Sequence, residues 1–191
     1  LLTLSVTSMF RDPGFFLQFR ELVVPILSTH PFLRLWVAGC ATGQEVYSLA
    51  ILLAEQLEGS GRRVQIFGSD VSAAALRTAR AGLYSEAAVR GLSSERRSCY
   101  FVRTEQGYRV TQPLREQCVF VQHDVTRDPP FSQLDLISCR NLLIYFDARL
   151  QQRVAARFHF GLRDPGFLLL GRNDATDSFA SFFRPLAKAL A

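Results

Sequence analysis

Two glycines followed by an acidic residue form the part of the chain with the clearest capacity for chemistry. Gly39 and Gly43 flank Cys40-Ala41-Thr42, and Glu45 follows two positions after the second glycine. Glycine lets the backbone turn tightly and approach a ligand where a Cβ would collide. The spacing is neither G-x-G-x-x-G nor a phosphate loop, and the Glu45 carboxylate would repel a pyrophosphate. The pattern points to a cationic, phosphate-free ligand such as S-adenosylmethionine.

Two further carboxylates end apolar segments later in the chain. Asp70 follows Gly43 by twenty-seven residues, and a carboxylate there can accept hydrogen bonds from both ribose hydroxyls of a nucleoside. The alternative is that Asp70 caps the next helix, although Ser72 already offers that cap. Asp124 could accept a hydrogen bond from the exocyclic amine of adenine, and its alternative is to form a turn. We favour the ligand roles because both residues continue the series begun by the glycine loop.

A second dense motif follows the apolar segment 134–139. This segment would deliver Arg140 and Asn141 to the same ligand edge, and the apolar residues after them lead to Tyr145. The alternatives are that Arg140 is a surface residue and that Tyr145 is a core aromatic. These alternatives are less favoured when the motif is considered together with the glycine loop.

Histidine and cysteine offer little chemistry of their own. The chain contains 3 histidines and 4 cysteines, with no plausible nucleophile–histidine arrangement and no metal-ligand spacing. We expect His30 and His123 to be structural or exposed, and we expect no metal site. Cys40 and Cys139 fall at predicted strand ends, which favours buried free thiols in a reducing compartment such as the cytoplasm.

The candidate residues require strands that end at one edge of a sheet. Alternating strands and helices predict an α/β fold, a mostly parallel Rossmann-like sheet with helices on both faces. A small β-hairpin insert is predicted by two segments, 100–102 and 108–110, that lie on either side of a turn at Gly107. The expected strands are 33–38, 64–69, 118–122, 134–139 and 167–170. Two expected helices are 45–57 and 147–160. A third is capped by Ser72 and ends at Arg80.

We expect two parts along the chain. Residues 1–32 form an N-terminal lead and a helix, from Phe15 to Leu27, that packs over the cofactor; Ser8 or Asp12 would cap it, with Pro13 in its first turn. Residues 33–191 form the ligand-binding domain, with the β insert at about 83–118. The sequence begins without a methionine, so we expect a fragment boundary there.

Composition limits the class of protein. The 191 residues are 48% hydrophobic, enough for one domain with a sizeable core. No apolar stretch is long enough to span a membrane, and no signal-peptide pattern is present, so we expect no direct membrane insertion. The net charge of +5 comes mainly from arginine; because the arginines are scattered, solvated faces are favoured over a nucleic-acid surface.

Taken in chain order, the motifs resemble the CheR-type chemotaxis receptor methyltransferases. The resemblance implies a class I S-adenosylmethionine-dependent methyltransferase fold, with S-adenosyl-L-methionine as cofactor and S-adenosyl-L-homocysteine as product. It also implies a protein-glutamate O-methyltransferase whose partners are the cytoplasmic domains of methyl-accepting chemotaxis receptors. It extends over nearly the whole chain, through residues 7–12, 38–50, 69–72, 82–84, 100–101 and 139–146.

The same resemblance assigns roles to individual residues. It places Tyr145 beside the transferred methyl group, and Arg11 is our candidate for steering the acceptor carboxylate or closing over the cofactor. Arg11 and Tyr145 are therefore the candidate catalytic residues. A glutamate acceptor is already ionised near neutral pH, so no general base is required. The candidate cofactor contacts are Thr7, Arg11, Gly39, Glu45, Asp70, Asp124, Val125, Arg140 and Asn141.

Several departures from the family pattern matter. This chain has Gln44-Glu45 where the family commonly has Glu-Glu, and it has Asp124 where the family usually has asparagine. After the final Leu-Gly, the family's usual Ser-Glu is replaced by Arg172-Asn173-Asp174. The family's small helical domain does not precede the lead, so receptor docking is expected to be altered. The turn around Gly107 is short and lacks the glycine-rich sequence of members that bind a receptor's C-terminal pentapeptide, which argues against that binding mode.

Two other functions remain open. One is a non-catalytic S-adenosylmethionine-binding regulatory module within a larger sensory protein, suggested by the altered segment 172–174 and the missing helical domain. The other is a methyltransferase with a different acceptor, including nucleic acid, suggested by the pI of about 9.4. No Asn-Pro-Pro-Tyr type motif follows the fourth predicted strand, which argues against a nucleic-acid acceptor.

Overall fold

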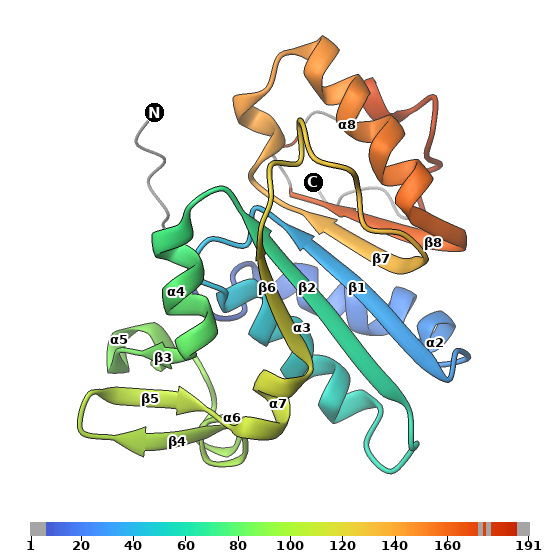
Figure 1. The fold of residues 1–191 in the computed structure, drawn as a ribbon. Coiled ribbons are helices and arrows are strands. Elements are labelled where there is room, and N and C mark those ends of the chain that lie inside the picture. The colour runs from blue at the N-terminus through green and yellow to red at the C-terminus, as the bar shows by residue number, and fades with distance from the viewer. Residues whose placement is uncertain (1–6, 172–173, 175–176, 187–191) are drawn as a thin grey trace.

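The computed structural model describes residues 7–171, 174 and 177–186. Its centre is a five-stranded sheet in the order β6-β2-β1-β7-β8, with every neighbouring pair parallel (Figure 1). The five predicted strands are confirmed. The last one begins at Leu162 rather than Phe167, because Leu162 pairs with Leu134 ahead of a register shift. The strands are β1 (Phe32–Ala38), β2 (Arg63–Asp70), β6 (Cys118–Gln122), β7 (Leu134–Cys139) and β8 (Leu162–Leu170).

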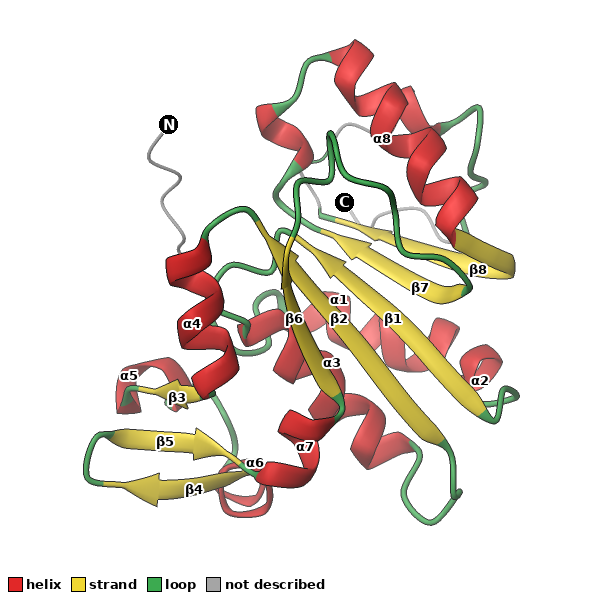
Figure 2. Cartoon of the chain, viewed as in Figure 1, coloured by secondary structure: helices red, strands yellow, loops and turns green. Residues whose placement is uncertain are grey.

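Helices cover both faces of this sheet (Figure 2). Helix α8 (Ala148–Gly161) packs on one face, where Phe158 and Val154 join a buried cluster around Trp36. Helix α3 (Gln44–Gln56) packs on the other face, within a larger cluster that includes the N-terminal helical residues. This three-layer arrangement confirms the predicted fold class. Two further helices, α4 (Ala73–Ala81) and α7 (Gln112–Glu116), also lie beside the sheet.

The N-terminal segment is helical but not one regular α-helix. It consists of α1 (Pro13–Gln18), a π-helical turn η1 (Phe19–Val23) and α2 (Val24–Leu27). Pro25 has no N–H to bond the carbonyl four residues earlier, which accounts for the irregular hydrogen bonding before it. Asp12 occupies the N-cap position of α1, with Pro13 in the first turn, as one of the two predicted alternatives has it, but its side chain makes no capping hydrogen bond. The other alternative, Ser8, is not the N-cap residue.

The insert is larger than a hairpin. The predicted hairpin is confirmed as β4 (Phe101–Thr104) and β5 (Gly107–Val110), and a third strand, β3 (Leu83–Tyr84), pairs with β5. Two helices, α5 (Glu86–Val89) and α6 (Ser94–Tyr100), precede the hairpin. Sequence patterning missed these elements because each is too short to show a clear period.

The parallel register brings the carboxyl ends of four strands to one edge. Ala38 of β1 lies opposite Ser69 of β2, Asp70 lies opposite Gln122 of β6, and Val37 lies opposite Ser138 of β7. Ligands of open α/β sheets bind outside this edge. Within the residues that the structure describes, no helix has the length and apolar character needed to cross a membrane.

Candidate active site

The loop between β1 and α3 has an unusual backbone. Gly39, Ala41 and Gly43 all have positive φ, at +71°, +48° and +90°. A Cβ at position 43 would lie 2.8 Å from the Cβ of Ala79 on α4. The glycine at position 43 is therefore required by packing against α4 as well as by the turn, and the loop presents bare backbone at the sheet edge.

Asp70 fixes this loop. Its Oδ2 accepts a hydrogen bond from the Ala41 N–H at 2.9 Å, and its Oδ1 accepts one from the Ser72 N–H at 2.9 Å. Ser72 itself caps α4 by accepting from the Ala75 N–H, so the alternative capping role for Asp70 is wrong. Each carboxylate oxygen retains a lone pair, and the carboxylate is only half-buried. The ribose contact stays a prediction.

Asp124 forms a turn at the end of β6. Its Oδ1 accepts from the N–H of Thr126 at 2.9 Å and from its hydroxyl at 2.6 Å, and its Oδ2 lies 3.6 Å from Nε of Arg127. Burial alone would raise the pKa of Asp124, but these hydrogen bonds and the Arg127 charge bring the pKa below its usual value. Asp124 is thus an anion at neutral pH. Val125, next to it, is buried against the α8 side of the sheet, and both cofactor contacts stay predictions.

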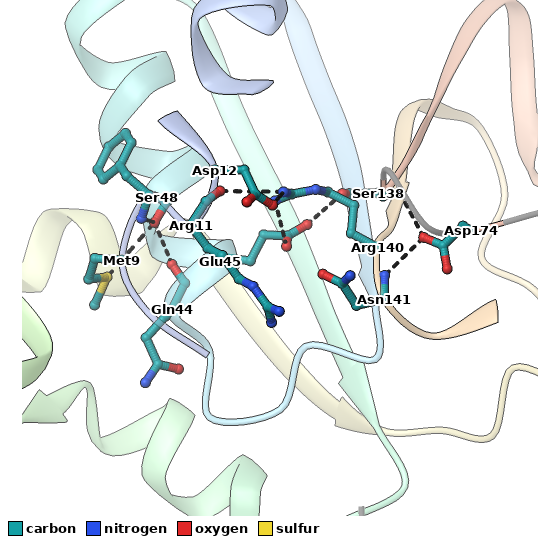
Figure 3. Close-up of polar contacts among 12 residues, drawn as sticks. Met9, Arg11, Asp12, Gln44, Glu45, Ser48, Ser138, Arg140, Asn141 and Asp174 are labelled. Atoms are coloured by element: carbon teal, nitrogen blue, oxygen red, sulfur yellow. Dashed lines mark hydrogen bonds and ion pairs between the residues drawn. The ribbon is translucent and has the colours of Figure 1, made fainter. Parts of the chain in front are cut away.

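A buried charge network lies beside the glycine loop (Figure 3). The Arg140 side chain is 2% exposed and donates to Glu45 Oε2 at 3.2 Å and to Asp12 Oδ2 at 2.6 Å. Ser138 donates its hydroxyl to Glu45 Oε1 at 2.5 Å. Burial raises the pKa of Glu45, while Arg140 and Ser138 oppose the rise. The alternative that Arg140 is a surface residue is therefore wrong.

Arg140 also attaches the N-terminal lead to the sheet edge. Its Nη2 donates to the Arg11 carbonyl at 3.3 Å, and its Cζ lies 3.8 Å from the centroid of the Phe15 ring. Sequence reasoning missed Asp12, Phe15 and Ser138 as partners of this network. No local pattern could have found the Asp12–Arg140 pair, because the two residues are 128 positions apart.

Arg11 and Asn141 both belong to segments that contact this network. Arg11 is exposed, its guanidinium extends away from Arg140 (Figure 3), and its charge helps to oppose the rise in the pKa of Glu45. Asn141 has a positive φ of 60° and donates its N–H to Asp174 Oδ2 at 2.9 Å.

Asp174, which sequence reasoning treated only as a departure from the family, also accepts from the Gly171 N–H at 2.7 Å. It therefore connects the ends of β7 and β8. Thr7, the first residue described, is half-buried, and its cofactor contact stays a prediction.

Tyr145 lies on the surface rather than in the core. It ends a 3-10 turn, η2 (Leu143–Tyr145), and is 55% exposed, so the alternative of a core aromatic is wrong. Gln151 of α8 holds this turn by donating its Nε2 to the carbonyls of Leu143 and Phe146, both at 3.1 Å. The catalytic role of Tyr145 stays a prediction.

His123 and His30 both make contacts that stabilise the fold. The His123 ring packs against Trp36 and Phe131, with its Nε2 2.9 Å from the Pro129 carbonyl. His30 pairs with the buried Asp135 at 3.1 Å. Within the described part of the chain, no three metal-binding side chains gather at one point. Cys40 and Cys139 are free and buried, as predicted, and burial raises the pKa of both thiols.

The chemistry of these side chains suits a cationic nucleoside. Glu45, Asp70 and Asp124 bring three carboxylates to the edge, and the buried Arg140 is already paired with two carboxylates. A phosphate would meet repulsion there, whereas a sulfonium would not. The residues therefore fit S-adenosylmethionine, with Asp70 and the Gly39–Gly43 loop available to hold it.

Comparison with known proteins agrees with this arrangement. Residues 5–189 match the family described as CheR methyltransferase, SAM binding domain. The chain is 40% identical to the Cher3 protein of Pseudomonas putida, over 98% of this chain and 71% of that protein. It is 33% identical to the chemotaxis protein methyltransferase of Listeria monocytogenes, over 91% of this chain and 66% of that protein. An uncharacterised 104.1 kDa protein of Rhodobacter capsulatus is 38% identical, but the matched region is only 19% of its length.

Solved structures support the fold. The glycopeptide N-methyltransferase MtfA in complex with S-adenosylhomocysteine superimposes with a TM-score of 0.52 at 13% identity, covering 86% of this chain and 54% of that one. Its complex with sinefungin gives a TM-score of 0.51 at 14% identity. At this identity the likeness concerns the fold alone, which is that of class I methyltransferases.

Proposed function

The chain belongs to the CheR methyltransferase family, and from that premise we propose that it transfers a methyl group from S-adenosylmethionine to glutamate side chains of methyl-accepting chemotaxis receptors. The matched region is the family's S-adenosylmethionine-binding domain. We place the activity in the cytoplasm, where the receptors expose their signalling domains.

The observation that carries the proposal is the carboxylate-rich edge of the sheet. Asp70 holds the glycine loop through Ala41, and Glu45 is held by Arg140 and Ser138. These contacts hold the carboxylates in place before any ligand binds. This favours binding, because little side-chain conformational entropy is then lost when the ligand binds. Asp70 ends β2, whereas Glu45 lies in the first turn of α3 beside Arg140, so we expect Asp70 at the ribose and Glu45 toward the methionine part of the cofactor.

The remaining residues suit a carboxylate acceptor. When bound, the cofactor supplies a methyl group on a positively charged sulfur, which an oxygen nucleophile displaces in line. Arg11 is exposed at the site, and a guanidinium pairs with a carboxylate in a fixed geometry. We propose that Arg11 orients the acceptor glutamate and that the hydroxyl of the exposed Tyr145 donates a hydrogen bond to it. The chain's part is alignment and exclusion of water rather than proton transfer.

The proposal is tested with S-adenosylmethionine carrying a tritiated methyl group. The protein is incubated with a cytoplasmic receptor fragment and, in parallel, with the same fragment in which the glutamates are replaced by glutamine. We expect label in the first fragment that mild base releases as methanol, since esters are base-labile. Stable label would indicate an amide or amine product instead, and cofactor binding without transfer to any receptor fragment would favour the regulatory module.

A further inference from the structure

Arg96 joins three parts of the chain at a point outside the candidate site. It lies on α6 of the insert and donates from Nε to Glu55 Oε1 at 2.7 Å and from Nη2 to Glu55 Oε2 at 2.8 Å. Its Cζ also lies 4.1 Å from the centroid of the Phe10 ring. Two parallel charge-assisted hydrogen bonds fix the guanidinium plane, and a fixed cation attracts a ring placed over it. The insert, α3 and the N-terminal lead therefore meet at one side chain.

The lead needs such support because its backbone is unfavourable. Phe10 and Asp12 have positive φ values of 49° and 61°, a conformation that residues other than glycine adopt only where the surroundings hold them. The Phe10 N–H donates to the Ser48 hydroxyl at 2.9 Å, and Asp12 is paired with Arg140. Arg11 lies between these two held residues, so the direction of its side chain depends on both.

The two attachments differ in their relation to the site. Arg140 is itself a candidate cofactor contact, whereas Arg96 and Glu55 lie in none of the site motifs. We propose that Arg96, fixed by Glu55, is a positioning residue: by holding Phe10 it sets the direction in which Arg11 projects over the site. The role given to Arg11 rests on the proposed function, whereas the contact between Arg96 and the lead does not.

Hydrogen exchange tests the contact without any acceptor. The Phe10 amide should exchange about ten-fold faster in Arg96→Ala, and faster in Glu55→Gln, because the lead opens locally more often. Arg96→Lys keeps the charge but not the two parallel bonds, so it should lie between Arg96→Ala and the unaltered protein. Arg97→Ala on the same helix is the matched control and should leave the rate at Phe10 unchanged. An unchanged rate in both Arg96→Ala and Glu55→Gln would overturn the proposal.

A double-mutant cycle tests whether the contact acts through Arg11. We expect Arg96→Ala to lower kcat on the receptor fragment about ten-fold, with a much smaller change in S-adenosylhomocysteine affinity, as displaced orienting groups do. Arg11→Lys keeps the positive charge but removes the planar guanidinium that would orient the acceptor. In that background Arg96→Ala should lower kcat much less, because the orienting contact has already been lost. The milder Glu55→Gln replaces Arg96→Ala if that variant does not fold.

The outcomes separate this inference from the proposed function. Equal losses of kcat in both backgrounds would show that Arg96 acts independently of Arg11, and the positioning role would be wrong. If Arg11→Lys itself leaves kcat unchanged, the catalytic role of Arg11 fails and the positioning role fails with it. Faster exchange at Phe10 would then still establish the contact between Arg96 and the lead.

Discussion

At the scale of single residues, the site side chains support one another before any ligand binds. Asp70 uses both carboxylate oxygens on backbone N–H groups, and Arg140 uses its guanidinium on Glu45, Asp12 and the Arg11 carbonyl. A substitution here therefore has two effects, loss of a ligand contact and loosening of the loop. Tests of individual roles need variants in which these effects can be told apart.

Asp70→Ala should weaken S-adenosylhomocysteine binding by about 1.5–3 kcal/mol, the usual loss for a hydrogen bond to a charged group. Calorimetry on the folded variant measures this directly. Asp70→Asn is the comparison variant, because it keeps an acceptor oxygen for the Ala41 N–H and should lose less. Undiminished affinity in a folded Asp70→Ala protein would remove Asp70 from the cofactor site.

Tyr145→Phe should lower kcat clearly while leaving S-adenosylhomocysteine affinity almost unchanged. The substitution keeps the ring and deletes only the hydroxyl, and the ring is already largely exposed, so folding should not change. Methyl transfer to a receptor fragment and calorimetry are measured on the same preparation. Ile144→Ala in the same turn, also exposed, controls for disturbance of the surface. Unaltered turnover in Tyr145→Phe would limit the tyrosine to contact through its ring.

At the scale of elements, one end of the sheet carries the candidate site and the other contributes to stability. The carboxyl end carries the site, and the amino end carries a buried anion, Asp135, that ties strands together. Its Oδ2 accepts from the Arg34 N–H of β1 at 2.7 Å, and its Oδ1 lies 3.1 Å from His30 and 3.2 Å from Arg163 of β8. Asp135 is fully buried, so these contacts stabilise the fold far from the site.

Asp135→Asn should lower the free energy of unfolding by about 1–2 kcal/mol, because the neutral amide loses the attraction of Arg163, whose own side chain is 28% exposed and can be solvated. Urea denaturation measures the change, with the exposed Glu105→Gln as a control that should alter stability little. S-adenosylhomocysteine affinity of the folded fraction should stay the same, because the amino end lies away from the ligand edge. A stability loss below 0.5 kcal/mol would show that solvent replaces these contacts.

At the scale of the whole molecule, two histidines and two cysteines of the described residues near the sheet have surroundings that do not suit a general base. His123 is packed against Trp36, and His30 is at the opposite end of β1. Burial raises the pKa of the two site-adjacent thiols, Cys40 and Cys139, so neither is a thiolate at neutral pH. These surroundings suit the acceptor that we propose, a glutamate carboxylate that is already ionised.

The rate at saturating cofactor should therefore stay flat from about pH 6 to pH 8, since a glutamate acceptor is ionised throughout that range. Methyl transfer to a receptor fragment is measured across this range, with the stability of the protein followed in the same buffers. A steep rise that follows a group with a pKa near 7 would contradict a carboxylate acceptor and favour an amine or thiol.

The sequence by itself determined the strands, the order of the motifs and the edge where they meet. Apolar runs that end in Gly39, Asp70, His123-Asp124 and Arg140 predict parallel strands, and parallel strands place those ends together. The local signals were sufficient because the central strands β1 and β7 are largely buried and the helices α3 and α8 that pack on the sheet show a helical period of their own. The irregular start of β8 and the short elements of the insert carried no such signal.

Only the tertiary structure decided how the side chains pair. Asp12 pairs with Arg140, Arg96 with Glu55, and Asp174 with Asn141, and each pair is far apart in sequence. Sequence patterning placed Asp12 at the start of a helix, where it lies, but could not show that its carboxylate pairs with Arg140 rather than with the helix N-terminus. Patterning along the chain reports which face of an element is apolar, whereas the partner of a charged side chain is set by the distances that folding creates.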